Sequence, residues 1–323
     1  MNRALRFVPR LLAAGAIAIV VAGIGFEGLH GAAWTVILVS AGLCACVIAR
    51  RINRMPWMFI VAVLVAGLSI VVFDVHVGDD PGTSSGLTSL VVDLVVGFAL
   101  LTVLALAIRF RRGRLDERDG NDLLTVALGS SLSVWIVVTS RLIHVDGFEP
   151  LQALGATAFM PIATLLFTFI VDLAFTGLTS NRTMQFVTLA AGMTLVAAAG
   201  NAFTLIGLVE LSHDSETALF ASAFVLLCAG LTHPDAPAML VPERSNDAAA
   251  AYTPFRLALN GACLVVPGVL VASLAPFDGT DVLIRVLLLL GLVCSVIVRL
   301  FVAVRSHEIA HDELASRLHL DEL

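Results

Sequence analysis

The feature that most constrains this chain is a series of ten long apolar segments separated by short polar breaks. Each segment is close to the ~20 residues that an α-helix needs to cross the hydrocarbon core of a bilayer. The segments lie at 11–29, 32–49, 56–77, 87–110, 123–144, 152–177, 185–209, 217–232, 257–276 and 281–303. The sequence therefore predicts an all-α, polytopic membrane helix bundle of about ten transmembrane helices.

The composition excludes a soluble globular enzyme. Hydrophobic residues make up 59% of the 323 residues and charged residues only 14%, whereas soluble domains carry roughly 25% charged residues. Ten spans would use nearly the whole chain, so no second folded domain fits beside them. The five cysteines all lie in apolar segments and do not form the spacing of a disulfide framework.

The arginines give an orientation, because basic residues accumulate on the cytoplasmic side of membrane proteins. All 19 basic residues are Arg. If the amino terminus is placed inside, only Arg141 and Arg285 fall outside, so both termini are predicted to be cytoplasmic. Arg285 lies one turn into the last span, where we expect it to pair with Asp281 at i, i+4 and to extend toward the outer interface.

The polar breaks divide the chain into unequal parts. The longest break, 234–254, is rich in Pro and Ala, and it is predicted to be a flexible cytoplasmic joint. It separates an eight-helix block, 1–232, from the last two helices, 257–303. The bundle would thus occupy 1–303, and residues 304–323 would form a helix in the cytoplasm.

Polar residues deep inside predicted spans are the first candidates for a ligand site. Asp93 and Asp172 lie well inside apolar segments, where an ionisable group costs at least a few kcal/mol unless it is paired or hydrated. Asn201 and Asn260 lie in the seventh and ninth spans. All four could line a site for an unknown small ligand, and the alternative is that they hydrogen-bond between helices.

A second group of candidates lies at the predicted outer ends of the helices. These histidines and neighbouring carboxylates could bind a cation such as Zn²⁺ or titrate as a pH sensor. They are His76, His144, His213, Asp74, Asp146 and Asp214. Their spacing is not that of a known metal motif, and ordinary polar caps at helix ends are the alternative. No catalytic triad, phosphate loop or metalloprotease motif is present, so we expect no catalytic residue and no cofactor. Nothing in the sequence points to a nucleic-acid partner.

The carboxy-terminal segment is predicted to continue the last span as one helix, since residues 300–320 contain neither Gly nor Pro. Apolar and histidine side chains recur there at alternating steps of three and four, which is typical of a short coiled coil. The positions are Ile297, Leu300, Val304, His307, His311, Leu314 and Leu318. The alternative is an amphipathic tail that lies on the membrane surface.

The last residues resemble the signalling helix that leads into a GGDEF domain. Asp321-Glu322-Leu323 matches the acidic-x-Leu step at that junction. The preceding region is similar to the ten-helix amino-terminal portions of cyclic di-GMP signalling proteins of high-GC bacteria, in which a His-Pro step such as His233-Pro234 precedes the final two spans. The resemblance implies a bacterial inner-membrane sensor and a homodimer through the terminal helix. The GGDEF and Glu-Ala-Leu catalytic motifs are absent from the 323 residues, so the chain is expected to be an input half and not itself an enzyme.

Two functions are therefore open. The first is a sensory module that regulates a diguanylate cyclase-type output domain. The second is a small-molecule permease, because the predicted topology also resembles the drug/metabolite transporter superfamily, with Asp93 and Asp172 at a midplane site. Substrate flux that disappears in Asp93→Asn or Asp172→Asn would identify the permease. A membrane enzyme acting on lipid is disfavoured, because no His or carboxylate pair lies at the predicted cytoplasmic interface.

Overall fold

The computed structural model describes residues 7–25, 31–51, 60–61, 64–65, 91, 94–102, 117–146, 148–176, 182–237 and 254–321. All regular structure in these residues is helical. The helices are α1 (Val8–Gly25), α2 (Gly31–Arg51), α5 (Glu117–Val134), the π-helical turn η2 (Trp135–Thr139), α6 (Ser140–His144), α7 (Pro150–Thr157), α8 (Phe159–Thr176), α9 (Arg182–Leu205), α10 (His213–Thr232), α11 (Pro254–Ser273) and α12 (Gly279–Asp321). The predicted all-α class is confirmed for the described part of the chain.

Five helical stretches are long and apolar enough to cross a membrane. They are Gly120–His144, Pro150–Val171, Arg182–Leu205, Asp214–Thr232 and Gly279–Phe301. Shorter apolar stretches lie in α1, α2 and α11. These eight coincide with predicted segments, whereas the segments at 56–77 and 87–110 lie largely outside the described residues. The helical, membrane-type architecture is therefore established, and the count of ten spans stays a prediction.

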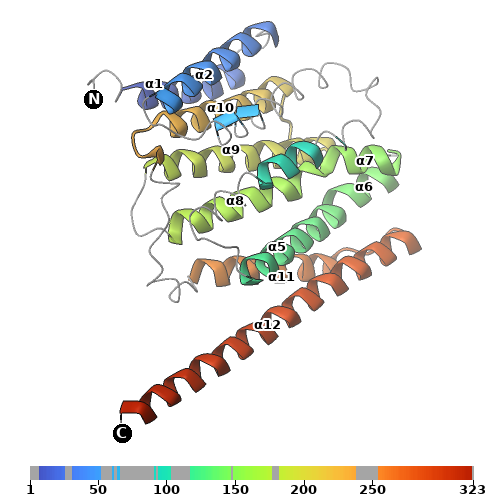
Figure 1. The fold of residues 1–323 in the computed structure, drawn as a ribbon. Helices are drawn as coiled ribbons and strands as arrows, with labels where there is room; N and C mark the ends of the chain where they lie inside the picture. Colours follow the sequence, from blue (N-terminus) through green and yellow to red (C-terminus); the bar gives the residue numbers. More distant parts are fainter. Residues whose placement is uncertain are drawn as a thin grey trace.

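The helices pack as a series of neighbours across the molecule (Figure 1). Helices α1 and α2 contact α10, α10 contacts α9, α9 contacts α8, and α8 contacts α5. Helix α5 in turn contacts both α11 and α12. Among the five long apolar stretches, the one in α10 is the most enclosed and the one in α12 the least. Helix α12 therefore lies at the edge of the bundle, with α5 as its main neighbour.

The core around α10 is built from small side chains. Small residues let membrane helices approach closely, and close approach strengthens the van der Waals contacts that hold such helices together. The buried alanines of this cluster are Ala16, Ala45, Ala49, Ala190, Ala197, Ala218, Ala221 and Ala236. The Ser222 hydroxyl donates to the carbonyl of its own helix at Ala218 and lies 3.0 Å from the carbonyl of Ala16. This polar contact ties α10 to α1 inside the apolar core.

Local signals fix both ends of α10. Ser212 precedes the helix in an extended conformation, and its hydroxyl oxygen accepts a hydrogen bond from the backbone N–H of Ser215, as an N-cap residue does. At the other end His233 is extended, with ψ 141°. A residue before proline disfavours the helical conformation, so Pro234 ends α10 at the His-Pro step.

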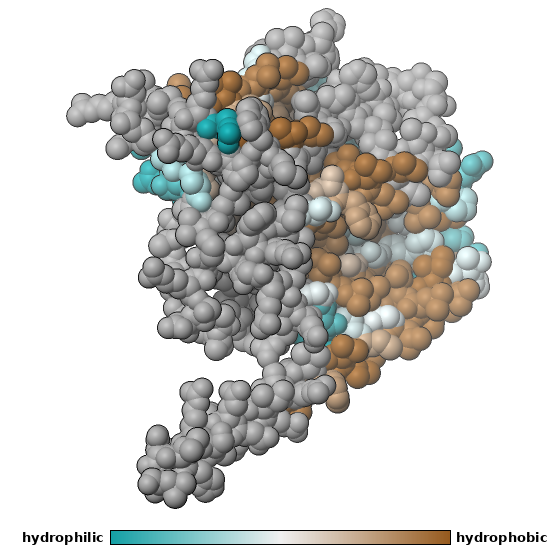
Figure 2. Space-filling view, in the orientation of Figure 1, coloured by the Kyte–Doolittle hydropathy of each residue, from teal (hydrophilic) through white to brown (hydrophobic). Residues whose placement is uncertain are grey.

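The outer surface of α12 is apolar. Figure 2 shows apolar side chains gathered on the side of the molecule where α12 begins. Side chains of this helix are described as far as Val304, and the exposed large apolar ones among them are Val282, Leu283, Val286, Leu287, Leu290, Val293, Ile297, Val298, Leu300, Phe301 and Val304. A continuous apolar surface of this kind is what a lipid-facing helix requires, and it would favour aggregation in water.

Candidate functional site

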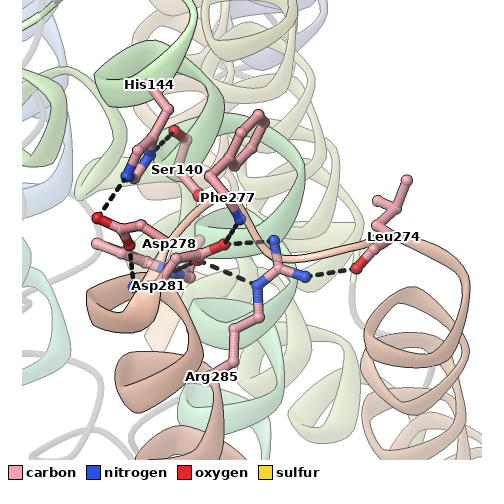
Figure 3. A network of polar contacts seen from close by, with 8 residues as sticks. Ser140, His144, Leu274, Phe277, Asp278, Asp281 and Arg285 are labelled. Carbon is pink, nitrogen blue, oxygen red and sulfur yellow. Dashed lines mark hydrogen bonds and ion pairs between the residues drawn. The ribbon is translucent and has the colours of Figure 1, made fainter.

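A polar network lies where α12 begins, between α12, the turn that precedes it and the rod formed by α5, η2 and α6 (Figure 3). The network starts with the cap of α12. The carbonyl of Asp278 accepts from Val282 N–H at 3.1 Å, and its Oδ1 accepts from Asp281 N–H at 2.7 Å. Asp281 reaches back, and its Oδ2 accepts from Phe277 N–H at 3.0 Å. Two aspartates thus satisfy backbone donors around the start of α12, in the manner of a capping box.

Asp281 also forms a buried ion pair with Arg285 on the next turn. Arg285 Nε donates to Asp281 Oδ1 at 3.0 Å, and Nη2 lies 2.8 Å from Oδ2. Arg285 Nη1 donates to the carbonyl of Leu274 at 2.7 Å. The side chain of Asp281 is 0% exposed and that of Arg285 is 5% exposed. The pair is bidentate, a geometry that gives strong charge-assisted hydrogen bonds, and because it is desolvated, removing either partner would leave the other charge buried and unpaired.

The predicted contact between Asp281 and Arg285 is confirmed, whereas the position of Arg285 relative to the outer interface stays a prediction. The guanidinium reaches back toward the start of α12, because Asp281 and the carbonyl of Leu274 supply acceptors for it there. Turning away from Asp281 would leave that carboxylate buried without its cation, and an unpaired buried charge is very costly.

Trp135 links this pair to the α5–η2–α6 rod. Its indole Nε1–H donates to Asp281 Oδ1 at 2.8 Å. Trp135 begins η2, a π-helical turn within an otherwise α-helical rod. Such turns shift the register of the residues around them and are frequent at functional sites. Asp281 therefore accepts hydrogen bonds from its own helix, from the preceding turn and from a neighbouring helix.

His144, the last residue of α6, contacts the other aspartate of the cap. Its Nε2 lies 3.3 Å from Asp278 Oδ2, and its Nδ1 lies 2.7 Å from the carbonyl oxygen of Ser140. The imidazole also stacks on Phe277, with 5.0 Å between ring centroids and 2° between the ring planes. The N–H of Asp281 and the imidazole of His144 lower the pKa of Asp278, so this carboxylate is ionised at neutral pH.

A second set of polar contacts joins α5 and α12 farther along both helices. Asn121 Nδ2 donates to the carbonyl of Ser295 at 3.0 Å, and the hydroxyls of Thr125 and Ser295 share a hydrogen bond of 2.8 Å. Asp122 Oδ1 lies 3.1 Å from Arg299 Nε. The two helices are antiparallel, since early residues of α5 meet late residues of the apolar stretch of α12. Helix α12 is thus held to one rod by polar contacts at two levels.

The structure places the predicted ligand-site residues apart from this network. Asn201 of α9 donates from Nδ2 to Oε1 of Glu216 on α10, at 2.5 Å. This is an interhelical hydrogen bond, the alternative weighed for the two asparagines. Asp172 lies in α8 and Asn260 in α11, and their side chains are outside the described residues. Asp93 is also outside them.

Of the predicted outer histidines and acids whose side chains the structure describes, only His144 enters the network. Asp146 follows α6 and is exposed, and Asp214 is in the first turn of α10. His213 begins α10, with its side chain outside the described part, as are the whole of Asp74 and His76. Among the residues that the structure describes, no three His, Cys, Asp or Glu side chains are grouped so as to hold a metal ion.

The sequence interpretation missed Trp135 and the link between His144 and Asp278. One available signal was the Asp278-x-x-Asp281 spacing before a long apolar run, which is an N-terminal capping pattern. The other signal was topology, because His144 and Asp278 both lie at breaks that the arginine distribution assigns to the outer face.

For the predicted terminal helix, the structure describes the backbone as far as Asp321. Val304 is 58% exposed. The other four proposed signalling positions lie on α12, and nothing is described of their side chains; they are His307, His311, Leu314 and Leu318.

The fold and the network define a class and no more: a helical protein with several helices suited to a membrane, and a polar cluster where its last helix begins. A scan against protein-family models found no match, and searches of curated proteins and of solved structures gave no significant match either. Function must therefore be inferred from this chain's own residues.

Proposed function

We propose that the chain is the membrane-embedded sensory region of a signalling protein, in which α12 conveys the state of the bundle to its carboxy-terminal end. The observation that carries this proposal is the continuity of α12, a single helix of 43 residues. At 1.5 Å per residue it is about 65 Å long. Its first turn belongs to the polar network, and Figure 1 shows its carboxy-terminal part extending away from the other helices.

Helix α12 is suited to conveying the state of the bundle, because other helices enclose little of it. Its polar contacts with the α5–η2–α6 rod run from Asp281 to Arg299, and its apolar stretch is the least enclosed of the five. A helix held on one side only can shift or rotate as a unit, because it has few neighbours to repack. A ligand or ion that favours one position of the start of α12 would therefore favour one position of its far end.

The proposed dimer interface uses the coiled-coil positions of the same helix. Ile297, Leu300 and Val304 are 59%, 61% and 58% exposed, so they face away from α5. They continue the three-four spacing of the terminal segment. Two copies of α12 packed along this line would bring their carboxy-terminal ends together, and the resemblance of residues 311–323 to GGDEF-linked helices supports a diguanylate cyclase-type domain as the output. The proposal includes a bacterial inner membrane and cytoplasmic termini, which the arginine distribution favours.

Removing the terminal helix is expected to abolish dimerisation. In lipid nanodiscs or detergent, the full chain should be a dimer, and the chain ending at Val304 should be a monomer at the same concentration. The reason is that the deleted residues contain most of the coiled-coil positions. Mass photometry or light scattering of both proteins measures the difference.

Point substitutions provide a matched control for that deletion. Leu314→Asp with Leu318→Asp places charges on the proposed interface, whereas Ala315→Asp with His319→Asp places the same charges on neighbouring positions. We expect the first pair to weaken the dimer at least ~10-fold, since buried like charges oppose association, and the second pair to have little effect. A monomeric full chain, or a dimer that survives the deletion, would contradict the proposal.

A further inference from the structure

We infer that the contact between His144 and Asp278 is a proton-controlled latch between α6 and the start of α12, closed when His144 is protonated. The latch is a property of the bundle and can be tested without any output domain. Its meaning as a signal rests on the function proposed above, with protons as the input.

The geometry around the imidazole specifies its charge. Nδ1 faces a carbonyl oxygen, that of Ser140, and Nε2 faces a carboxylate oxygen, that of Asp278. Both neighbours are acceptors, and a neutral imidazole has only one N–H. Only the imidazolium presents an N–H to both oxygens, so this arrangement favours protonated His144. In the neutral ring, a hydrogen bond to Ser140 would leave the Nε2 lone pair pointing at a negative charge.

The Asp278 carboxylate is ionised throughout the pH range in which an imidazole titrates. The Asp281 N–H and the His144 imidazole depress the pKa of Asp278, so loss of the contact on raising the pH is due to His144. The contact is also open to protons, because the exposed side-chain fractions are 21% for His144 and 49% for Asp278. An imidazole ordinarily titrates near pH ~6.5, and the latch is therefore closed below its midpoint and opens above it.

The other charges around His144 divide between its own segment and α12. From α12, Asp281 contributes to the electrostatics at His144 and is itself paired with Arg285. On its own segment, Arg141 lies one turn earlier, and Asp146 and Glu149 follow in the connection to α7. Among these groups only Asp278 lies within ion-pair distance of the imidazole in the described structure. The latch therefore depends on one carboxylate, which also caps α12.

Opening the latch would change which contacts hold the start of α12 to the neighbouring helices. Stacking of His144 on Phe277 and the ion pair to Asp278 both join α6 to the turn before α12. The bond from Trp135 to Asp281 lies one helical segment away and does not involve the imidazole. If the contacts of His144 are released while the hydrogen bond from Trp135 to Asp281 is retained, the turn can move and the helix stays anchored. The start of α12 would then pivot about Asp281.

Dipolar electron paramagnetic resonance in nanodiscs tests the latch directly. With all five native cysteines replaced by alanine, spin labels are placed at Val145→Cys and Thr280→Cys, two exposed positions beside the contact. We expect a short, narrow distance distribution at pH 5 and a longer or broader one at pH 8.5. A control pair at Leu124→Cys and Val298→Cys lies at the other end of the α5–α12 contact, and its distribution should not change.

Two substitutions make the test decisive. His144→Gln should remove the pH dependence. Asp278→Asn should lower the midpoint, since an opposite charge favours the imidazolium, and Asn still caps α12. If either variant fails to fold, the other answers the question. A distribution that is the same at both pH values in the chain with His144, or that changes equally with His144→Gln, would overturn the latch.

The test separates the latch from the proposed function. A chain ending at Val304 keeps His144, Asp278 and their surroundings, so its distances should titrate as in the full chain. Titration without dimerisation would retain the latch and contradict the signalling dimer. Dimerisation without any change of the distances with pH would support the signalling dimer and contradict the latch.

Discussion

Replacing Arg285 with Met is expected to lower the free energy of unfolding by about 3–5 kcal/mol, the usual cost of removing one partner from a buried ion pair. Met fills much of the same space but donates nothing. The Asp281 carboxylate, which is 0% exposed, would keep the indole N–H of Trp135 and the backbone N–H of Phe277. Reversible unfolding in mixed detergent micelles measures the loss.

Two comparison variants show whether the lost partner is the cause. Arg141→Met removes an exposed guanidinium from α6, and a substitution of this kind usually changes stability by no more than about 0.5 kcal/mol. Combining Asp281→Asn with Arg285→Met removes both charges and should recover part of the loss, because no unpaired charge stays buried. If Arg285→Met and Arg141→Met unfold alike, the ion pair does not stabilise the start of α12.

The helices could largely be predicted from the sequence because a bilayer leaves a spanning segment little choice. Backbone polar groups must be satisfied within the segment, so a run of about 20 apolar residues becomes a helix. Eight predicted segments coincide with described helices for this reason. The unbroken course of α12 was predictable from the lack of Gly and Pro after Leu300, and the contact between Asp281 and Arg285 from their i, i+4 spacing.

The contacts between helices were not predictable in the same way. Helical periodicity identifies residues on one face, but it does not say which neighbour covers that face. The direction of Arg285 depends on the carbonyl of Leu274 and on an aspartate enclosed by another helix. The position of Trp135 depends on a π-helical turn, and the sequence contains no local signal for that turn.

His144 and Asp278 illustrate an intermediate case. Each was recognisable as a titratable group at the predicted outer face, and His144 was a candidate for pH sensing on that ground. Their contact joins the end of one span to the start of another, far away in the sequence. One sequence gives no means to choose this partner among the other outer carboxylates. The capping role of Asp278 was the local feature that could have narrowed the choice.

Introducing a methyl group at Gly129 is expected to separate α5 from α11 and to destabilise the protein by about 1–3 kcal/mol, the typical cost of overpacking a core. A Cβ atom there would clash with the carbonyl oxygen of Cys263 and would lie 3.1 Å from its Cβ. The nearest atom belongs to the backbone, so no rotation of a side chain relieves the contact. The same unfolding measurement applied to Gly129→Ala gives the size of the effect.

Gly261→Ala is the matched control, because a Cβ at Gly261 of α11 would meet nothing within 4 Å. Alanine is the better helix former by up to ~1 kcal/mol, so this variant should be as stable as the unsubstituted chain or more so. The two substitutions are chemically identical and differ only in what faces them. Opposite signs would establish that α5 and α11 touch at Gly129, whereas equal stability would contradict the close approach of the two helices. Cys263→Ala should not rescue Gly129→Ala, since it leaves the obstructing carbonyl in place.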